Sequence, residues 1–428
     1  MHNSTSNTRT TQFRKRDNVI YFSGKVNSYN VKEFCGAVSV FKTNHSDTLT
    51  LDFTRVVNAY PNGMLPIIAT VEKLRRNGTK IKILLPSDDN TRKLFRAVNW
   101  AHYLSPELFQ PSESKHDRHL VTRYFTDEKD QKNASDDLLD VIIRSMVLPR
   151  SIISGLEWSI NEIMDNVLNH SNSLIGGLVQ ATTYPTKGII AFAVADAGRG
   201  ILNSLREGIP TLRTDIQAMG EAVKAGVTRN SAYGQGNGLA GTLKITTLTG
   251  GSFDITSGSG RLLSTAEETV PKPWEKHEYY HGTLICGQVK IKEDFSIGQA
   301  LDFGTGIDYV PVDLIEMFYE MESQNALFLK MKEETTGYGS RKSGLQIRTK
   351  IVNLLNAEPT YPLIIDWEGV PVTSSSFADE FMGKLFLKLG GITFSARIRN
   401  IGMEQLIKNL LDKAISQRLT QSIDDDNV

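Results

Sequence analysis

The sequence contains very little cysteine, and this scarcity excludes several classes of protein. Only Cys35 and Cys286 occur among 428 residues, so the chain lacks the clustered pairs of a zinc site or of a disulfide framework. Such usage is typical of a reducing compartment, and we expect a cytoplasmic protein.

Long apolar runs and an excess of one charge are also missing. The longest strongly apolar stretch, residues 189–195, is far shorter than the roughly 20 residues of a membrane-spanning helix. The polar N-terminus has no apolar segment typical of a secretory signal. Lysine plus arginine and aspartate plus glutamate number 48 each, so no global field attracts nucleic acid or acidic lipid. We therefore expect neither a membrane nor a specific nucleic acid as a partner.

The composition that remains is that of a globular protein with several domains. Apolar residues make up 40% and charged residues 22%, which is typical of folded chains. The length corresponds to roughly two to four domains of about 100 to 200 residues.

Changes of pattern along the chain predict three folded α/β regions. Strands alternate with helices in the first and third regions, and two helical patterns precede strand-like runs in the second, which predicts an α/β sandwich with a mostly antiparallel sheet. The predicted boundaries are a disordered tail (1–16), an α/β domain (17–111), a central domain (137–292), a helical connector (293–335), a third domain (336–420) and an acidic tail (421–428).

The third region repeats the first. Placing Asp52 on Asp366 aligns LDFTRVV with IDWEGVP, and a helical pattern follows each segment. Two copies of a strand-turn-helix-strand unit are therefore expected to flank a different central domain.

The strongest chemical signal is a polar stripe on the helix predicted for residues 150–170. Glu162, Asn166 and His170 are spaced four residues apart, so they share one face of that helix. A carboxylate can orient a water and accept its proton, and an amide oxygen is a hard ligand suited to Mg²⁺. The alternative interpretation is an amphipathic helix whose polar residues face solvent.

Three segments downstream supply what a nucleotide site needs. Asp196 ends an apolar strand beside Gly198 and Gly200, where a carboxylate can accept a hydrogen bond from an exocyclic amine and glycines let a flat base approach. A glycine-rich segment then opens a helix, whose amides form a phosphate cradle. Its residues are Gly234, Gly236, Gly238 and Leu239. Gly282 and Thr283 begin a strand that could return under the base.

These four segments, in this order, resemble the boxes of the GHKL superfamily of ATP-binding domains, which DNA gyrase, heat-shock chaperones, MutL proteins and histidine kinases share. The resemblance covers about residues 137–292 and implies the Bergerat fold, an α/β sandwich that binds ATP and Mg²⁺. It implies that Glu162 is the general base, Asn166 the Mg²⁺ ligand and Asp196 the adenine contact. Thr283 would support adenine through water, and the glycines and leucine named above would line the nucleotide.

The same resemblance implies an ATP lid from about Lys224 to Gly238. The sequence does not choose among three cations for gripping phosphate, which are Lys224, Arg229 and Lys244. His170 completes an ExxxNxxxH pattern similar to that of anti-sigma-factor kinases, although a histidine packed at a helix end fits equally well. We expect Arg199 to be exposed; it lies in the first glycine turn, residues 196–200.

The flanking repeats resemble STAS-like domains, which are related to anti-sigma-factor antagonists. In those antagonists a GHKL-type kinase phosphorylates the first serine of a DSSG motif, and that position falls on Ser375. Ser374 and Phe377 replace the neighbouring aspartate and glycine, which weakens the assignment of a phosphoacceptor. Ser376 with Asp379 also resembles a helix capping box. The N-terminal copy has no serine at this position, and we expect it to mediate interactions only.

The preferred interpretation is an ATP-dependent switch, in which slow ATP hydrolysis controls how the STAS-like domains contact a protein partner in bacterial signalling or conflict systems. One alternative is a protein serine kinase acting on Ser375 or on a separate STAS protein. Another is a nucleotide-sensing scaffold without turnover. GHKL ATPases often dimerise with ATP bound, so the resemblance also implies a homodimer.

Overall fold

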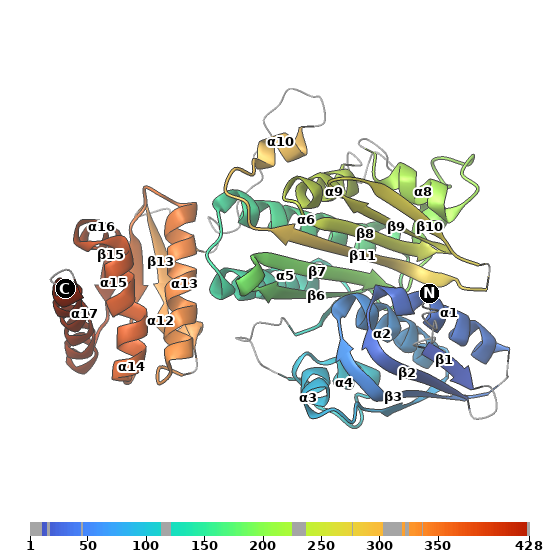
Figure 1. Ribbon diagram of the computed structural model, residues 1–428, viewed down its shortest axis with the longest axis horizontal. Helices are drawn as coiled ribbons and strands as arrows, with labels where there is room; N and C mark the ends of the chain where they lie inside the picture. Colours follow the sequence, from blue (N-terminus) through green and yellow to red (C-terminus); the bar gives the residue numbers. More distant parts are fainter. Residues whose placement is uncertain are drawn as a thin grey trace, which may run out of the picture. The chain divides into compact units, whose positions relative to one another are not determined.

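The computed structural model describes residues 11–14, 18–43, 46–112, 121–224, 237–275, 277–302, 319–321, 325–335 and 337–425. They form two compact units of mixed α/β structure (Figure 1). Unit 1 combines 1–139 with 155–309, and unit 2 combines 140–154 with 310–428. Within the described ranges, no helix is both long and apolar enough to cross a membrane.

Unit 1 contains a seven-stranded sheet in which all neighbouring strands run antiparallel, as the sequence predicts for the central region. The strands follow the order β10-β9-β8-β11-β7-β6-β5. Their bounds are β5 (Arg123–Phe125), β6 (Gly177–Tyr184), β7 (Ile189–Asp196), β8 (Ser252–Gly258), β9 (Gly260–Thr265), β10 (Thr269–Pro273) and β11 (Tyr280–Lys290).

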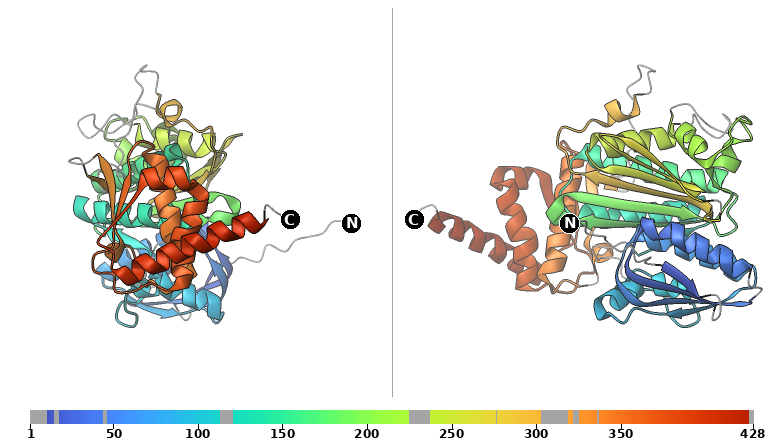
Figure 2. Two further views of the ribbon diagram at one scale, coloured as in Figure 1. Left: turned by 90° about the vertical axis from the view of Figure 1, so that its left-hand side faces the viewer. Right: turned by 45° about the vertical axis from the view of Figure 1, so that its right-hand side comes forward.

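Helices cover both faces of this sheet. One face carries α6 (Arg150–His170) and α9 (Gly238–Leu248). The other carries α1 (Ser28–Lys42) and α2 (Pro61–Arg76) from the N-terminal part of the chain (Figures 1 and 2). Double coverage explains why β6 and β7 are buried along most of their length instead of alternating between buried and exposed positions. The helices of this region are α5 (Glu128–Ser145), α6 (Arg150–His170), the short 3₁₀ turn η1 (Pro185–Lys187), α7 (Gly200–Leu205), α8 (Asp215–Ala222), α9 (Gly238–Leu248) and α10 (Ile297–Leu301).

The N-terminal module of unit 1 is a four-stranded sheet with its own helices. Strands β2, β3 and β4 are parallel, and β1 pairs antiparallel with β2 at the edge. The sequence places residues 11–14 in a disordered tail, and this is wrong: four residues with one apolar side chain give no strand signal, but the free edge of β2 pairs with them. The elements are β1 (Thr11–Arg14), β2 (Val19–Val26), α1 (Ser28–Lys42), β3 (Thr48–Ala59), α2 (Pro61–Arg76), β4 (Lys80–Leu84), α3 (Asp89–Ala97) and α4 (Trp100–Leu104).

The N-terminal module and the central region share one hydrophobic core, whereas the sequence predicts two separate domains. Helix α2 is buried at every position from Gly63 to Ala69, so it is apolar on all sides over two turns, as a helix between two layers must be. It contacts β6, β7 and β11 of the large sheet. The core accordingly includes Leu178, Ala193 and Leu284 from that sheet.

Unit 2 contains a second four-stranded sheet with the same order and directions as the N-terminal one. Its first pair is antiparallel and the remaining pairs are parallel, which agrees with the repeat seen in the sequence. The elements are β12 (Glu320–Met321), β13 (Ala326–Lys330), α12 (Met331–Glu334), α13 (Arg341–Ala357), β14 (Leu363–Asp366), α14 (Ser375–Ala378), the π-helical segment η3 (Asp379–Gly383), α15 (Lys384–Leu389), α16 (Gly391–Arg397), β15 (Ile398–Ile401) and α17 (Gln405–Asp425).

Three predicted boundaries in this half of the chain are corrected. The predicted helical connector contains β13, an inner strand of the sheet, because a run of four apolar residues does not distinguish a strand from a buried helix. The segment 140–154 belongs to unit 2 and not to the central domain. Helix α17 continues to Asp425, through most of the predicted acidic tail.

A buried group of four charges explains why segment 140–154 belongs to unit 2. Lys350, which is 1% exposed, donates to Asp140 at 2.7 Å and to Glu334 at 2.6 Å. Arg144 bonds to the same two carboxylates, so two cations balance two anions. Nearby, the Asn353 side chain accepts a hydrogen bond from the backbone N–H of Leu148 at 2.8 Å.

We predict that Lys350→Met destabilises unit 2 by about 3–5 kcal/mol, because it leaves the buried Glu334 and the partly buried Asp140 carboxylates with one cation. Lys330→Met is the matched control, since its ion pair with Glu333 is largely exposed and should contribute less than about 1 kcal/mol. Urea denaturation of both variants measures the difference, and equal small losses would contradict the prediction.

Candidate functional site

Helix α6 presents Glu162 and Asn166 to the start of α9. A Cβ atom on Gly238, the first residue of α9, would lie 2.4 Å from Glu162 Oε2 and 3.4 Å from Asn166 Nδ2. A side chain at this position would have to displace the carboxylate, so glycine permits the observed position of Glu162 beside α9. The structure therefore brings together two segments that are 72 residues apart in sequence (238 − 166).

The environment of Glu162 suits a general base. Burial raises the pKa of its carboxyl to about 7, and the nearby Asp165 carboxylate adds to the effect. Asp165 itself accepts a hydrogen bond from Gln131 Nε2 of α5 at 2.7 Å. A base whose pKa lies near neutral pH combines the correct ionisation state with a useful driving force for proton transfer.

Asp196 and Thr283 form a second cluster at the end of β7. The Asp196 side chain is almost completely buried, with 1% exposed, and its Oδ1 accepts a hydrogen bond from the backbone N–H of Gly198 at 2.7 Å. Thr283 donates to the same carboxylate through its backbone N–H and its hydroxyl. Burial outweighs these donors and raises the pKa of Asp196 to about 7.

The first glycine turn packs against the C-terminal end of α6. A Cβ atom on Gly198 would lie 2.1 Å from the carbonyl oxygen of Ser171, and Gly200 has a left-handed φ of 76°. Arg199 donates from its backbone N–H to the Ser171 carbonyl and from its Nε to the His170 carbonyl, each at 2.9 Å. The prediction that Arg199 is exposed is wrong, because its side chain is 17% exposed and pairs with Glu207.

One helix thus joins the two clusters. Glu162 and Ser171 are nine residues apart on or next to α6, which corresponds to about 13 Å along its axis. Glu162 and Asn166 lie in the second half of α6. The buried Asp196 and the glycine turn that follows it lie beside the C-terminal end of the same helix. The arrangement suits an extended ligand with a polar, anionic end and a flat end that donates a hydrogen bond.

The remaining predicted residues have varied positions. Gly234, Gly236 and Arg229 lie outside the described residues. Leu239 is in the first turn of α9. Lys224 pairs with Glu221 at 2.6 Å, and Lys244 donates to the carbonyl of Asp302 at 2.7 Å. His170 is the last residue of α6, the helix-end position that the sequence left open.

Ser375 lies in unit 2, where it is the exposed first residue of α14. The helix cap is Ser374, whose Oγ accepts from the backbone N–H of Phe377 and donates to the carbonyl of Gly339, each at 3.0 Å. The predicted capping box of Ser376 and Asp379 is wrong, because the Asp379 carboxylate binds Arg418 of α17 instead.

Sequence reasoning missed two residues that hold the first glycine turn. Lys73 Nζ, from α2, donates to the carbonyl of Ala197 at 2.6 Å. Tyr280 Oη, from β11, donates to the carbonyl of Asp196 at 2.7 Å. Tyr280 stands three residues before Thr283, so its position gave a weak signal, but no local pattern marked Lys73.

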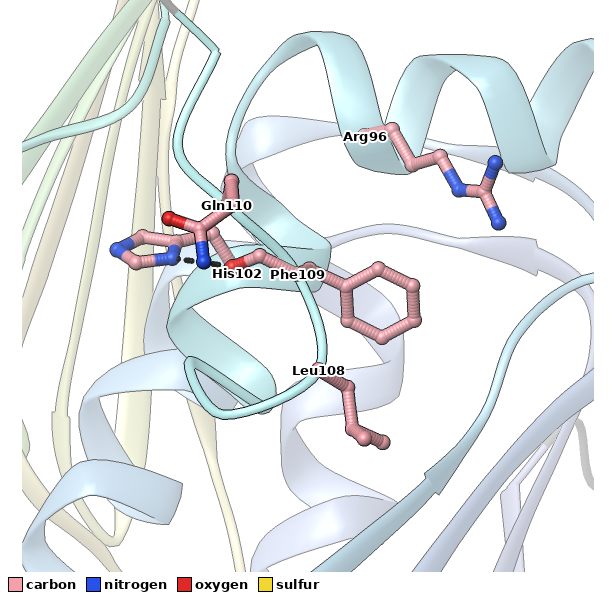
Figure 3. A pocket seen from close by; sticks show the side chains of 5 residues that line it. All are labelled: Arg96, His102, Leu108, Phe109 and Gln110. Atoms are coloured by element: carbon pink, nitrogen blue, oxygen red, sulfur yellow. Dashed lines mark hydrogen bonds between the residues drawn. The ribbon is translucent and has the colours of Figure 1, made fainter.

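A surface hollow of about 310 Å³ lies elsewhere on unit 1 (Figure 3). It is lined by Arg96, His102, Leu108, Phe109 and Gln110, and His102 Nδ1 lies 2.7 Å from the carbonyl oxygen of Phe109. None of these residues belongs to the motifs discussed above. Among the residues that the structure describes, no three His, Cys, Asp or Glu side chains gather as a metal site.

No family model matches the chain, and neither does any curated protein or solved structure. Function is therefore inferred from the motifs and from their geometry.

We predict that Asp196→Asn stabilises the free protein at pH 8. The folded-state pKa of Asp196 is raised, so the folded protein binds the proton more tightly than the unfolded chain, and stability falls as pH rises from about 4 to about 7. One pKa unit corresponds to about 1.4 kcal/mol, and altered bonding to Thr283 offsets part of the gain. We expect a net gain on the order of 2 kcal/mol at pH 8 that disappears near pH 4.

Thermal melting at several pH values measures this effect. Asp254→Asn is the control, because Asp254 is also a buried acid of the same sheet but is paired with Arg261 at 2.8 Å. That variant should lose stability at pH 8. An Asp196→Asn protein less stable than wild type at pH 8 would contradict the prediction.

Proposed function

We propose that the chain binds Mg²⁺-ATP and hydrolyses it slowly, as an ATP-dependent switch. The observation that carries this proposal is the contact of Gly238 with Glu162 and Asn166, because it joins the acid, the amide and a helix N-terminus. Such helix ends favour phosphate through their free N–H groups. The resemblance of the four motifs to GHKL ATP-binding domains points to the same function.

The residues of the second cluster fit an adenine ring. Ionised Asp196 is a hydrogen-bond acceptor, which matches the exocyclic amine of adenine and opposes the carbonyl oxygen that guanine carries there. Gly198 and Gly200 provide backbone without side chains for the approach of a flat base. Thr283, already bonded to Asp196, fixes the orientation of the carboxylate.

The first cluster fits the phosphates and a magnesium ion. The Asn166 amide oxygen would hold the metal, with phosphate and water oxygens as its other ligands. When bound, Mg²⁺ supplies neutralisation of the phosphate charge. Glu162 would orient the attacking water and accept its proton.

The N-terminal module and the nucleotide site belong to one compact unit, so the occupancy of the site is proposed to alter how this STAS-like module contacts a protein partner. A ligand can shift such an equilibrium only by its difference in affinity for the two states. The STAS-like module of unit 2 is proposed to bind a partner as well.

We predict that Glu162→Gln binds Mg²⁺-ATP normally but loses hydrolysis by at least about 100-fold, the lower end of what a general base contributes. Calorimetry measures the binding and phosphate release measures the turnover. A variant that keeps wild-type turnover would rule out Glu162 as the base, and a wild-type protein without turnover would favour the scaffold.

Asn166→Ala should lose the magnesium dependence of ATP affinity. Asn169→Ala is the matched control, because Asn169 is an exposed amide on the same helix. If both variants bind ATP with the same response to magnesium as wild type, Asn166 is not a metal ligand.

Serine kinase activity is a second candidate, favoured by the exposure of the Ser375 hydroxyl at a helix N-terminus, where a phosphate group is stabilised. Mass spectrometry after incubation with Mg²⁺-ATP distinguishes the candidates. Phosphate on Ser375 that disappears in Glu162→Gln supports the kinase, and free phosphate without modification supports the ATPase.

A further inference from the structure

Lys73 connects the N-terminal module to the turn that follows Asp196. It lies in the last turn of α2 and is half-buried, with its ammonium 2.6 Å from the carbonyl oxygen of Ala197. Ala197 is buried and directly follows Asp196. Lys73 therefore brings a positive charge from α2 of the N-terminal module to the second cluster, which contains Asp196 and Thr283.

The charge of Lys73 acts on the Asp196 carboxylate. Burial favours the neutral form of this acid, and the Gly198 and Thr283 donors, together with the positive charge of Lys73, oppose that effect. The interaction is mutual, because Asp196 also favours the charged form of Lys73, against its desolvation.

Other titratable groups surround this pair on the elements packed against it. Tyr280 of β11 interacts with Asp196, and Lys42 of α1 with Lys73. His281 of β11 faces both lysines, and burial lowers its pKa to about 4, so it stays neutral above pH 5. Tyr280 and Cys35 have pKa values raised far above neutral by burial. Burial raises the pKa of Asp196 to about 7, so this carboxyl changes its charge between pH 6 and 8.

We propose that Lys73 is a positioning residue through which the N-terminal module controls nucleotide affinity, by fixing the Ala197 carbonyl and keeping Asp196 ionised to accept a hydrogen bond from adenine. This inference rests on the proposed function. A protonated Asp196 would present a donor where the base also presents a donor. The acid is useful to an adenine site only while it carries its charge.

The coupling works in both directions. If the Lys73 contact raises the affinity for an adenine nucleotide, binding of the nucleotide strengthens that contact by the same factor. Nucleotide occupancy would then tighten α2 against the glycine turn, and a partner that moves α2 would weaken binding.

The test is calorimetric titration of the full chain with Mg²⁺-ATP between pH 6 and 9. Wild-type affinity should fall below a midpoint near pH 7. In Lys73→Met the midpoint should move up by about one pH unit, as expected for loss of a nearby opposite charge, which lowers the affinity at pH 7 up to about tenfold and restores it near pH 9. Lys73→Arg should retain the wild-type profile.

Lys32→Met is the matched control, because Lys32 is another lysine of the module that pairs with Glu278 outside this cluster. Its pH profile should equal that of wild type. A Lys73→Met protein whose affinity is unchanged, or is reduced equally at every pH, would overturn the inference, since a merely structural role does not move the midpoint.

A second measurement separates this inference from the proposed function. Without nucleotide, Lys73→Met should lower the melting temperature more at pH 8 than at pH 5, and this pH dependence should vanish in an Asp196→Asn background. Absence of the coupling overturns the role of Lys73 alone. A wild-type protein that shows the coupling but has no affinity for Mg²⁺-ATP overturns the proposed function, and with it the nucleotide part of the inference.

Discussion

The candidate site depends on two close approaches of glycine residues to α6. Near the middle of the helix, a side chain in place of Gly238 would have to displace the Glu162 carboxylate. At the end of the helix, a Cβ atom on Gly198 would overlap the Ser171 carbonyl, which is backbone and permits only glycine there. Because a helix of this length is a stiff rod, the two contacts determine how far the acid and amide stand from Asp196. The glycines thus set the geometry without contributing a functional group.

The second constraint is the burial of α2 between two sheets. A helix that is apolar on all sides over two turns holds its module against the large sheet, because separating the two surfaces would expose its side chains to water. The N-terminal module is therefore part of the scaffold of the site. Under the proposed role of Lys73, events at that module would reach Asp196 through packed atoms and one lysine, which is a short physical route compared with coupling between separate domains.

Local patterns in the sequence account for much of this architecture. The polar stripe of α6, the strand that ends in Asp196 and the antiparallel sheet all follow from periodicity and turn residues. The misses involve long-range contacts. The four apolar residues of β13 fit a strand or a helix, Arg144 finds its partner Glu334 190 residues away, and Lys73 bonds to a carbonyl 124 residues away. No window of sequence contains both partners of such contacts.

Two buried acids of the large sheet show what distinguishes a structural carboxylate from one that is available to a ligand. Asp254 is neutralised by the Arg261 guanidinium, which occupies both of its oxygens. Asp196 receives hydrogen bonds from neutral donors, and its nearest described cation, Lys73, bonds to the adjacent backbone instead of to the carboxylate. This arrangement leaves Asp196 costly to ionise but able to accept a further donor. Strongly perturbed carboxylates cluster at functional sites, and the proposed adenine ligand carries an amine donor of the required chemistry.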